Sequence, residues 1–312
     1  ANFWILTNIS YKNYFVYRPC HPALLNETFP ILFGQNLYAS VSTSLLIRPA
    51  NSVTATITQT NSGGAAAIKF LNASYITIDG INASGTALNI INTNSISNTA
   101  NIWLATSGGF GNSNIAVKNT YLAGGSYSNT SVLYGINAGA DVGLPSTSAG
   151  TDNDNITIQG NTFQNLYHGI YVTGNGQYSG SGFDNWAITS NTMGGATPSV
   201  NSIGGCGMYL QGMVNVTVTS NVMNNFTTTA ASMNAIRLNA NISGFVVNNN
   251  TLTNIWSSGT GGGTSSNSGF YFGTTVINGS VSYNKLVTVY NTNTGYWGVR
   301  GMIFVTGNMS SG

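Results

Sequence analysis

The stretch NITIQGNTFQNLYHGIYVTG at residues 155–174 contains two short alternations of apolar and polar residues, separated by corner residues. The letters ITI at 156–158 and IYV at 170–172 each direct two apolar side chains to one side of a strand and one side chain to the other. Between them, Gly160 and Asn161 are residue types that tolerate tight corners. The stretch therefore predicts two half-buried strands in one turn of a coil.

The second of these strands recurs along the chain as a five-residue segment with a variable middle residue. Its copies are AIKFL at 67–71, NIWLA at 101–105, YGINA at 134–138, HGIYV at 168–172, CGMYL at 206–210, NAIRL at 234–238, SGFYF at 268–272 and RGMIF at 300–304. Successive copies begin 28 to 38 residues apart. A period in this range indicates a solenoid, whose repeats bury their apolar faces by stacking on their neighbours.

Two further strands recur within each period. One follows the ITI pattern, as in YITIDG at 75–80 and NVTVTSN at 215–221, and a shorter one follows it, as in TLTNI at 251–255. The sequence therefore predicts an all-β fold, a parallel β-helix of about eight coils of ~28–38 residues with three short strands per coil. We assign residues 30–312 to the β-helix. Residues 1–29 fit the repeat worst and are either an N-terminal cap or an extended arm.

The composition argues against nucleic acid as a partner and against insertion into a membrane. Only 4% of the residues are charged, against roughly 25% in an average globular domain. The net charge is +2 without a basic run, so we expect no nucleic-acid partner, because phosphate neutralisation needs clustered Lys and Arg. No segment approaches about 18 consecutive apolar residues, so we also expect no membrane insertion.

The chain has two cysteines, Cys20 and Cys206, which are too few for a disulfide framework or a metal site. About five coils separate them in the predicted solenoid, or roughly 24 Å at a strand spacing of ~4.8 Å. A disulfide needs Cα atoms within about 7 Å of each other. We therefore expect no internal disulfide.

Three insertions interrupt the repeat at 139–153, 174–185 and 257–267. We place all three after the five-residue strand and before the ITI strand, so that they form loops on one side of the solenoid, where function is expected. The first insertion holds Asp152, and Asp154 directly follows this insertion. Their spacing offers alternating oxygen ligands for Ca²⁺ but lacks the Glu and Gly of an EF-hand. A Ca²⁺ site and a plain Asx-rich turn both fit these two residues.

The sequence suggests no catalytic and no cofactor-binding residues, and it favours a protein that is not an enzyme. Cleavage of a polysaccharide in this fold would need carboxylates that converge on one face. Among the six acidic residues, only Asp152 and Asp154 are neighbours. His168 aligns with Tyr134 and Cys206 in adjacent coils, so we interpret it as a variable corner.

The middle residues of the five-residue strand form a column that we expect to face outward. Four of them are aromatic, and Lys69 and Arg237 belong to the same column. Flat aromatic strips stack on sugars or on a neighbouring subunit, and outward aromatic rings also support one another across parallel strands. The column is therefore a candidate contact face for a glycan or a subunit, and its aromatic members are Trp103, Tyr171, Tyr209 and Tyr271.

The strands of TIDG and GIYV type and the corners GNTFQN and SNTM resemble the repeats of pectate-lyase-like proteins. The run from ETFPILF through IRPANSVTATI and AAIKFLNASYITIDG to NITIQGNTFQNLYHGIYV is similar to the Asn/Thr-rich repeat segments of large secreted surface proteins of the Bacteroidota. The similarity covers about residues 27–306. It implies a right-handed single-stranded β-helix, an extracellular or cell-surface location and no catalysis, although the pectate-lyase-like fold also includes lyases and hydrolases.

These observations predict a non-catalytic extracellular structural or adhesive protein that self-associates end to end into filaments or a surface matrix. The last coil, GMIFVTGNMSSG at 301–312, has no polar cap, whereas a solenoid end exposes unpaired strand edges. We expect another copy, or more of the same chain, to cover it. The alternative is a glycan-binding or polysaccharide-cleaving β-helix protein that uses the aromatic column or the insertion loops.

Overall fold

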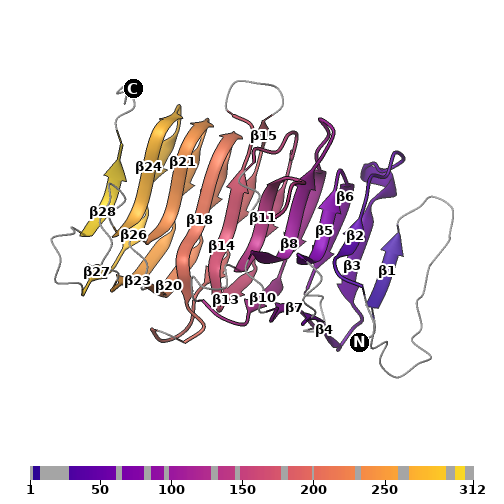
Figure 1. The fold of residues 1–312 in the computed structure, drawn as a ribbon, viewed down its shortest axis with the longest axis horizontal. Coiled ribbons are helices and arrows are strands. Elements are labelled where there is room, and N and C mark those ends of the chain that lie inside the picture. Colours follow the sequence, from indigo (N-terminus) through magenta and orange to yellow (C-terminus); the bar gives the residue numbers. More distant parts are fainter. Residues whose placement is uncertain are drawn as a thin grey trace.

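A computed structural model describes residues 3–7, 28–60, 65–80, 86–94, 98–127, 133–144, 148–176, 182–198, 200–228, 233–258, 267–292 and 299–305. These residues form a β-solenoid of about 7 turns with ~34 residues per turn and three parallel sheets, so the predicted fold class is confirmed (Figure 1). The turn count is slightly below the eight coils expected. The single helical element among the described residues is the 3-10 turn Val41–Thr43.

The strands of each coil are distributed over three sheets, which we call sheets A, B and C. Sheet A contains β1 (Phe3–Thr7), β3 (Leu45–Pro49), β6 (Ser74–Asp79), β9 (Ser113–Lys118), β12 (Thr157–Gln159), β16 (Ala187–Thr189), β19 (Thr217–Thr219), β22 (Val246–Asn248) and β25 (Ser280–Ser282). Sheet B contains β2 (Ile31–Phe33), β5 (Ala66–Leu71), β8 (Thr99–Thr106), β11 (Leu133–Ala140), β14 (Leu166–Thr173), β15 (Phe183–Asp184), β18 (Ile203–Val214), β21 (Asn234–Ser243), β24 (Asn267–Ile277) and β28 (Val299–Phe304). Sheet C contains β4 (Thr54–Gln59), β7 (Ala87–Asn92), β10 (Thr120–Gly124), β13 (Thr162–Gln164), β17 (Thr192–Met193), β20 (Val222–Thr228), β23 (Thr251–Ser257), β26 (Lys285–Leu286) and β27 (Val289–Asn291).

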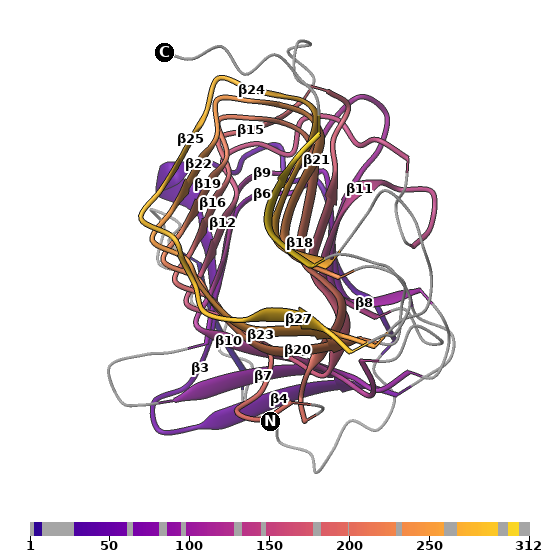
Figure 2. The same cartoon turned by 90° about the vertical axis from the view of Figure 1, so that its left-hand side faces the viewer.

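The chain visits the sheets in the order B, A, C and then returns to B one coil further on. Viewed along the coil axis, sheets A and B enclose the interior from two sides and sheet C closes the third (Figure 2). All described strand pairs between coils are parallel except β1 with β3, which is antiparallel. None of the described helical residues makes a span long and apolar enough to cross a membrane.

The register of sheet B confirms the alignment of the five-residue strand. Lys69 pairs with Trp103, and the same column continues through Asn137, Tyr171, Tyr209, Arg237, Tyr271 and Ile303. The unequal spacings of 28 to 38 residues therefore reflect loops of different length between strands that remain in register.

The core lies between the three sheets and consists of apolar residues from all of them, including those that flank the column in sheet B. Alternation in the five-residue strand predicts that the apolar residues on either side of each column member face inward, and those from Ile68 to Phe272 are buried there. The same pattern predicts burial of Met302 and Phe304, but they are 39% and 48% exposed. They lie on β28, the last strand of sheet B in the described part of the chain, so no further described coil packs on them.

An asparagine ladder holds the corner between sheets A and C. The Nδ2 of each member donates to the Oδ1 of the next member, at 3.1, 3.0, 2.9 and 2.9 Å, and also to a backbone carbonyl oxygen of the preceding coil. The next Oδ1 also accepts the backbone N–H of the previous member. Its members are Asn161, Asn191, Asn221, Asn250 and Asn284.

The residue before each buried asparagine turns the corner in the left-handed backbone region. It has a φ of 66° at Gly160, 56° at Ser190, 57° at Ser220 and 55° at Asn249. Glycine and asparagine tolerate this conformation best, which suits Gly160 and Asn249, whereas Ser190, Ser220 and Tyr283 before Asn284 (φ 52°) adopt it without that preference.

Glycine is required where neighbouring coils of sheet B approach closely. A Cβ on Gly135 or on Gly169 would lie 2.6 Å from the carbonyl oxygen of the glycine one coil further on, Gly169 and Gly207 respectively. This contact explains the glycine before the first inward residue in YGINA, HGIYV and CGMYL.

The insertions do not all lie on one side. Those at 139–153 and 174–185 connect sheet B to sheet A, as predicted. The insertion at 257–267 instead connects β23 of sheet C to β24 of sheet B, so the prediction was wrong for it. The cause is that TLTNI continues as strand through Ser257, so the extra residues follow the third strand of the coil.

At the N-terminal end, β1 adds an antiparallel strand to β3, with Ile5 opposite Ile47. Residues 8–27, which make up most of the predicted cap or arm, lie outside the described residues together with Cys20. Cys206 is buried on β18. The expectation that the two cysteines do not pair stays a prediction.

Candidate functional site

The outward face of sheet B gathers the aromatic and charged residues of the predicted column. The rings of Tyr171 and Tyr209 are stacked, with centroids 4.4 Å apart and planes 8° apart. The Arg237 guanidinium lies 4.5 Å from the Tyr271 ring centroid and 5.4 Å from that of Tyr209. Parallel in-register strands bring these residues from β14, β18, β21 and β24 into one continuous row.

Polar contacts fix the rings and the cation of this row. Arg237 donates from Nη2 and Nε to Asn239 Oδ1 at 2.7 and 2.9 Å. Asn239 Nδ2 donates to Gln211 Oε1 at 2.6 Å, and the Tyr209 hydroxyl donates to the same oxygen at 2.9 Å. Burial raises the pKa of Tyr209 well above its ordinary value, so its hydroxyl stays a neutral donor.

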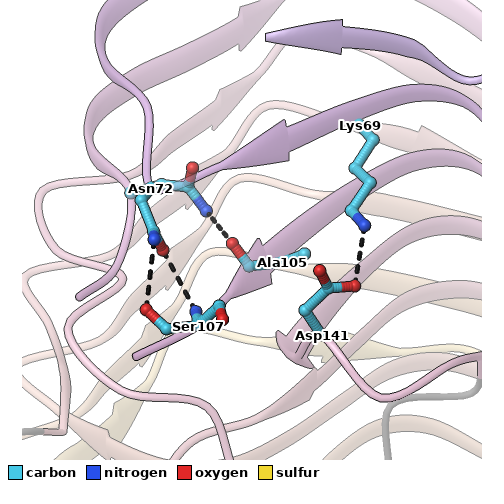
Figure 3. A network of polar contacts seen from close by, with 6 residues as sticks. Lys69, Asn72, Ala105, Ser107 and Asp141 are labelled. Carbon is cyan, nitrogen blue, oxygen red and sulfur yellow. Dashed lines mark hydrogen bonds and ion pairs between the residues drawn. The ribbon is translucent and has the colours of Figure 1, made fainter. Parts of the chain in front are cut away.

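At the other end of the column, Lys69 binds the first insertion. Its Nζ donates to Asp141 Oδ1 at 2.7 Å (Figure 3). The same Nζ lies 4.3 Å from the centroid of the Trp103 ring. In the same region, Asn72 donates from Nδ2 to the Ser107 carbonyl oxygen and accepts the Ser107 N–H, both at 3.1 Å. The Lys69–Asp141 pair therefore ties β5 to the segment that follows β11, and the Asn72–Ser107 bonds join the segments that follow β5 and β8.

The prediction that all four aromatic residues stand exposed was wrong for two of them. Trp103 is only 4% exposed and Tyr271 only 9%. Trp103 belongs to a second apolar cluster outside the barrel, against which Leu144 of the first insertion packs. Tyr171 and Tyr209 are half-buried, so they are the more accessible aromatic members of the column.

A second column runs beside the first and contains Tyr134, His168 and Cys206. The Tyr134 and His168 rings are stacked with centroids 5.2 Å apart, and His168 Nδ1 accepts the backbone N–H of Cys206 at 3.0 Å. The interpretation of His168 as a corner was wrong: the residue lies within β14, because its alternation begins at Leu166 rather than after the glycine.

The neighbouring His168 and Cys206 do not form an activated nucleophile. Burial lowers the pKa of His168 to about 3, and burial raises the pKa of the Cys206 thiol to about 12. A nucleophilic cysteine needs a lowered thiol pKa and a base that can be protonated. At neutral pH both groups are therefore neutral and structural.

The acidic residues of the first two insertions lie near one another. Asp154 Oδ1 accepts the backbone N–H of Asp184 at 3.0 Å. Burial, and then repulsion from Asp184 and Asp152, raises the pKa of Asp154, while burial and repulsion from Asp152 raise that of Asp184. Within the described residues, no group of three or more His, Cys, Asp or Glu side chains is arranged to hold a metal ion. Ca²⁺ binding by Asp152 and Asp154 stays a prediction.

Asn137, the column member between Trp103 and Tyr171, is not among the residues predicted from the sequence to form a contact face. Asn137 is completely buried, and neither of its side-chain polar atoms has a hydrogen-bond partner. The Nε1 of Trp103 is also buried without a partner. The signal that would have found Asn137 is an asparagine among aromatic residues in an otherwise aligned column.

The chain matches no protein-family model, no curated protein and no solved structure.

Proposed function

We propose that the protein is a non-catalytic structural or adhesive β-solenoid of the extracellular space or the cell surface. The observation that carries this proposal is the asparagine ladder from Asn161 to Asn284, in which one set of contacts recurs in successive coils. Stability in such an array is a sum over neighbouring coils. An elongated body of this kind is suited to span a distance and to present a surface.

Two sequence features support the location and the role. The resemblance to Asn/Thr-rich surface repeats of the Bacteroidota favours an extracellular protein of adhesin or matrix type. A charged fraction of 4% leaves the surface to be hydrated by neutral polar side chains.

Self-association through coil stacking is part of this proposal. Three apolar residues of β28, the last described strand of sheet B, are exposed, namely Val299 at 37%, Met302 at 39% and Phe304 at 48%. A second copy of the chain would bury them by adding its own coil to this edge.

Electron microscopy at low and high concentration tests the assembly. We expect end-to-end fibres at high concentration, and fewer fibres for Met302→Glu. A matched control is Val200→Glu, because Val200 is an exposed apolar residue between β17 and β18. Monodisperse rods at every concentration would contradict the assembly.

Incubation with a panel of acidic and neutral polysaccharides tests the absence of catalysis. We expect no new reducing ends and no unsaturated products. Cleavage that Asp152→Asn or Asp184→Asn abolishes would overturn this part of the proposal.

Glycan binding is the second candidate function, and the stacked rings of Tyr171 and Tyr209 favour it. A half-buried aromatic ring whose hydroxyl is held by Gln211, as that of Tyr209 is, offers an apolar surface on which a sugar can pack. Affinity electrophoresis in polysaccharide gels would show retardation that Tyr209→Ala removes. Tyr38→Ala is the control, because Tyr38 is 86% exposed and lies away from the column.

A further inference from the structure

Two adjacent described residues of sheet B, Trp103 and Asn137, contribute three buried polar atoms without a hydrogen-bond partner. They are Oδ1 and Nδ2 of Asn137, a residue with no exposed surface, and Nε1 of Trp103, which is 4% exposed. Native proteins pair the large majority of buried polar atoms, since an unpaired one costs stability. Three unpaired atoms on adjacent strands therefore indicate that something else pairs them.

The surroundings of these atoms are aromatic. Asn137 on β11 is in register with Trp103 on one side and with Tyr171 on the other. Three residues earlier on the same strand, the Tyr134 ring meets that of Tyr171 edge to face, with centroids 5.3 Å apart. A side-chain amide with a free donor and a free acceptor thus lies among aromatic rings.

No charge is offered to a ligand by the residues in contact with this cluster. The nearest cation, Lys69, is engaged by Asp141 at 2.7 Å. The apolar residues packed against the cluster are Ala65, Leu71, Leu144 and Tyr171, and the His168 ring stacks on that of Tyr134. We therefore expect a neutral ligand.

The segment from Asp141 to Leu144 covers the cluster through a small number of contacts. Leu144 packs on it, Asp141 pairs with Lys69, and the Asp141 N–H donates to the Thr106 carbonyl oxygen at 2.8 Å. The ion pair is partly exposed, with its side chains 15% and 25% accessible. Partly exposed ion pairs stabilise weakly, so breaking this pair to admit a ligand beneath the segment would cost little free energy.

We propose that Trp103, Asn137 and Tyr134 form a binding site for one neutral hydroxylated ring, of the class of a hexose unit. A hydroxyl group both donates and accepts, so it pairs with the Asn137 amide, and a second hydroxyl accepts from the Trp103 indole N–H. The apolar face of the ring packs on the aromatic side chains. The site is independent of the structural function proposed above, which a failure here would leave untouched.

The test uses the full chain with uniform ¹⁵N labelling and three probes, D-glucose, D-galactose and D-mannose. We expect at least one hexose to shift the side-chain amide signals of Asn137 and the indole signal of Trp103 in a saturable way. D-glucuronate, which adds a charge, should bind no better than the neutral sugar.

Variants separate this site from other surfaces of the protein. Asn137→Leu should weaken hexose binding by about tenfold or more, because it removes both amide partners. Asn89→Leu is the matched control and should bind as the wild type does, since Asn89 lies on β7 of sheet C. Asp141→Asn loosens the cover and should speed association.

The outcomes are decisive in both directions. Wild-type signals of Asn137 and Trp103 that move together with a hexose, and a Trp103 indole signal that moves less in Asn137→Leu, support the site. If none of the three hexoses moves these signals, the proposal is wrong. The proposal is also wrong if Asn137→Leu binds the hexose as the wild type does. It is wrong as well if this variant binds no hexose and is less stable than the wild type, because a loss of stability would mean that internal water pairs the Asn137 amide.

Discussion

The buried asparagines of the corner ladder and the buried Asn137 on sheet B lie on opposite sides of the same solenoid. The ladder side chains are hydrogen-bonded, whereas the side chain of Asn137 is not. Asn191 in the corner ladder is fully buried, and its side chain makes four hydrogen bonds, to Asn161, Ile158 and Asn221. Asn137 on sheet B is equally buried and its side chain makes none. The same residue type at the same burial is therefore a structural support in one place and an unsatisfied group in the other.

The identity of the neighbours in adjacent coils explains the difference. Asn191 has an asparagine directly before and after it along the coil axis, so each amide pairs with the next. Asn137 has Trp103 and Tyr171 in those places. In a solenoid, a buried side-chain amide can pair with the same amide in the next coil. An amide without such a neighbour lacks these hydrogen bonds.

The largest expected effect is the loss of one amide from the ladder. Asn191→Leu should lower the free energy of unfolding by about 3 kcal/mol, because it leaves the Asn161 N–H, the Ile158 carbonyl and the Asn221 Oδ1 with fewer partners. Urea denaturation measures the change. Asn89→Leu serves as the control, since Asn89 makes one long bond of 3.3 Å to Thr56; an equal loss in both variants would show that the ladder has no special role.

Acid should destabilise the protein through His168, which lies in the column beside Asn137. Burial holds the pKa of His168 at about 3 in the folded chain, below the ~6.5 of the unfolded chain, so protons bind preferentially to the unfolded chain as the pH falls below 6.5. We expect the free energy of unfolding to fall by about 2 kcal/mol between pH 7 and pH 4, after allowance for the partial exposure of the His168 ring.

The control for this pH effect is His168→Gln, which retains a hydrogen-bond acceptor for Cys206 and does not titrate. Asp154 and Asp184 have raised pKa values and give stability changes of the opposite sign in acid, in both proteins alike. Denaturation midpoints at pH 4 to 7 should therefore fall more steeply for the wild type. Parallel profiles would mean that His168 is protonated in the folded chain.

An Asn→Leu substitution on sheet B should change the free energy of unfolding in the opposite direction from the one in the ladder. Asn137→Leu should raise the free energy of unfolding by about 1 kcal/mol, because an apolar side chain of similar size replaces an amide that pairs with nothing. Urea denaturation under the ladder conditions measures it. A loss of stability would show that Asn137 has a partner in the unliganded protein.

The smallest expected effect concerns the cover over Asn137. Asp141→Asn should lower the free energy of unfolding by about 0.5 kcal/mol at low salt, and by less at high salt, because the Lys69–Asp141 pair is partly exposed. Thermal unfolding at two ionic strengths measures it. A loss that does not change with salt would mean that Asp141 acts through its backbone contacts alone.

Much of the fold could be predicted from the sequence because the repeats are visible in it. The letters of HGIYV and its copies align Tyr171 with Asn137 and Tyr209, and the observed register has the same pairs. Period-two alternation determines which side chains face the core, so most of the inward residues follow from the pattern. Corner asparagines such as Asn191 could also be located by their spacing of about 30 residues.

The site was less predictable because it depends on what covers sheet B. Alternation shows that Trp103 faces away from the core, but not that Leu144 of an insertion packs on it. Loop conformation leaves no periodic signal, so burial of Trp103 and the isolation of Asn137 could not be read from the repeats. His168 was assigned to a corner because its column holds unlike residues, although those residues are side by side on strands.

The most direct test of the account compares the side-chain amide protons of Asn191 and Asn137 in one ¹⁵N spectrum of the unliganded protein. We predict small temperature coefficients for Asn191, as for hydrogen-bonded amides, and large ones for Asn137, with signals displaced by the surrounding rings. Small coefficients for both would contradict the account, since Asn137 would then be a second structural support.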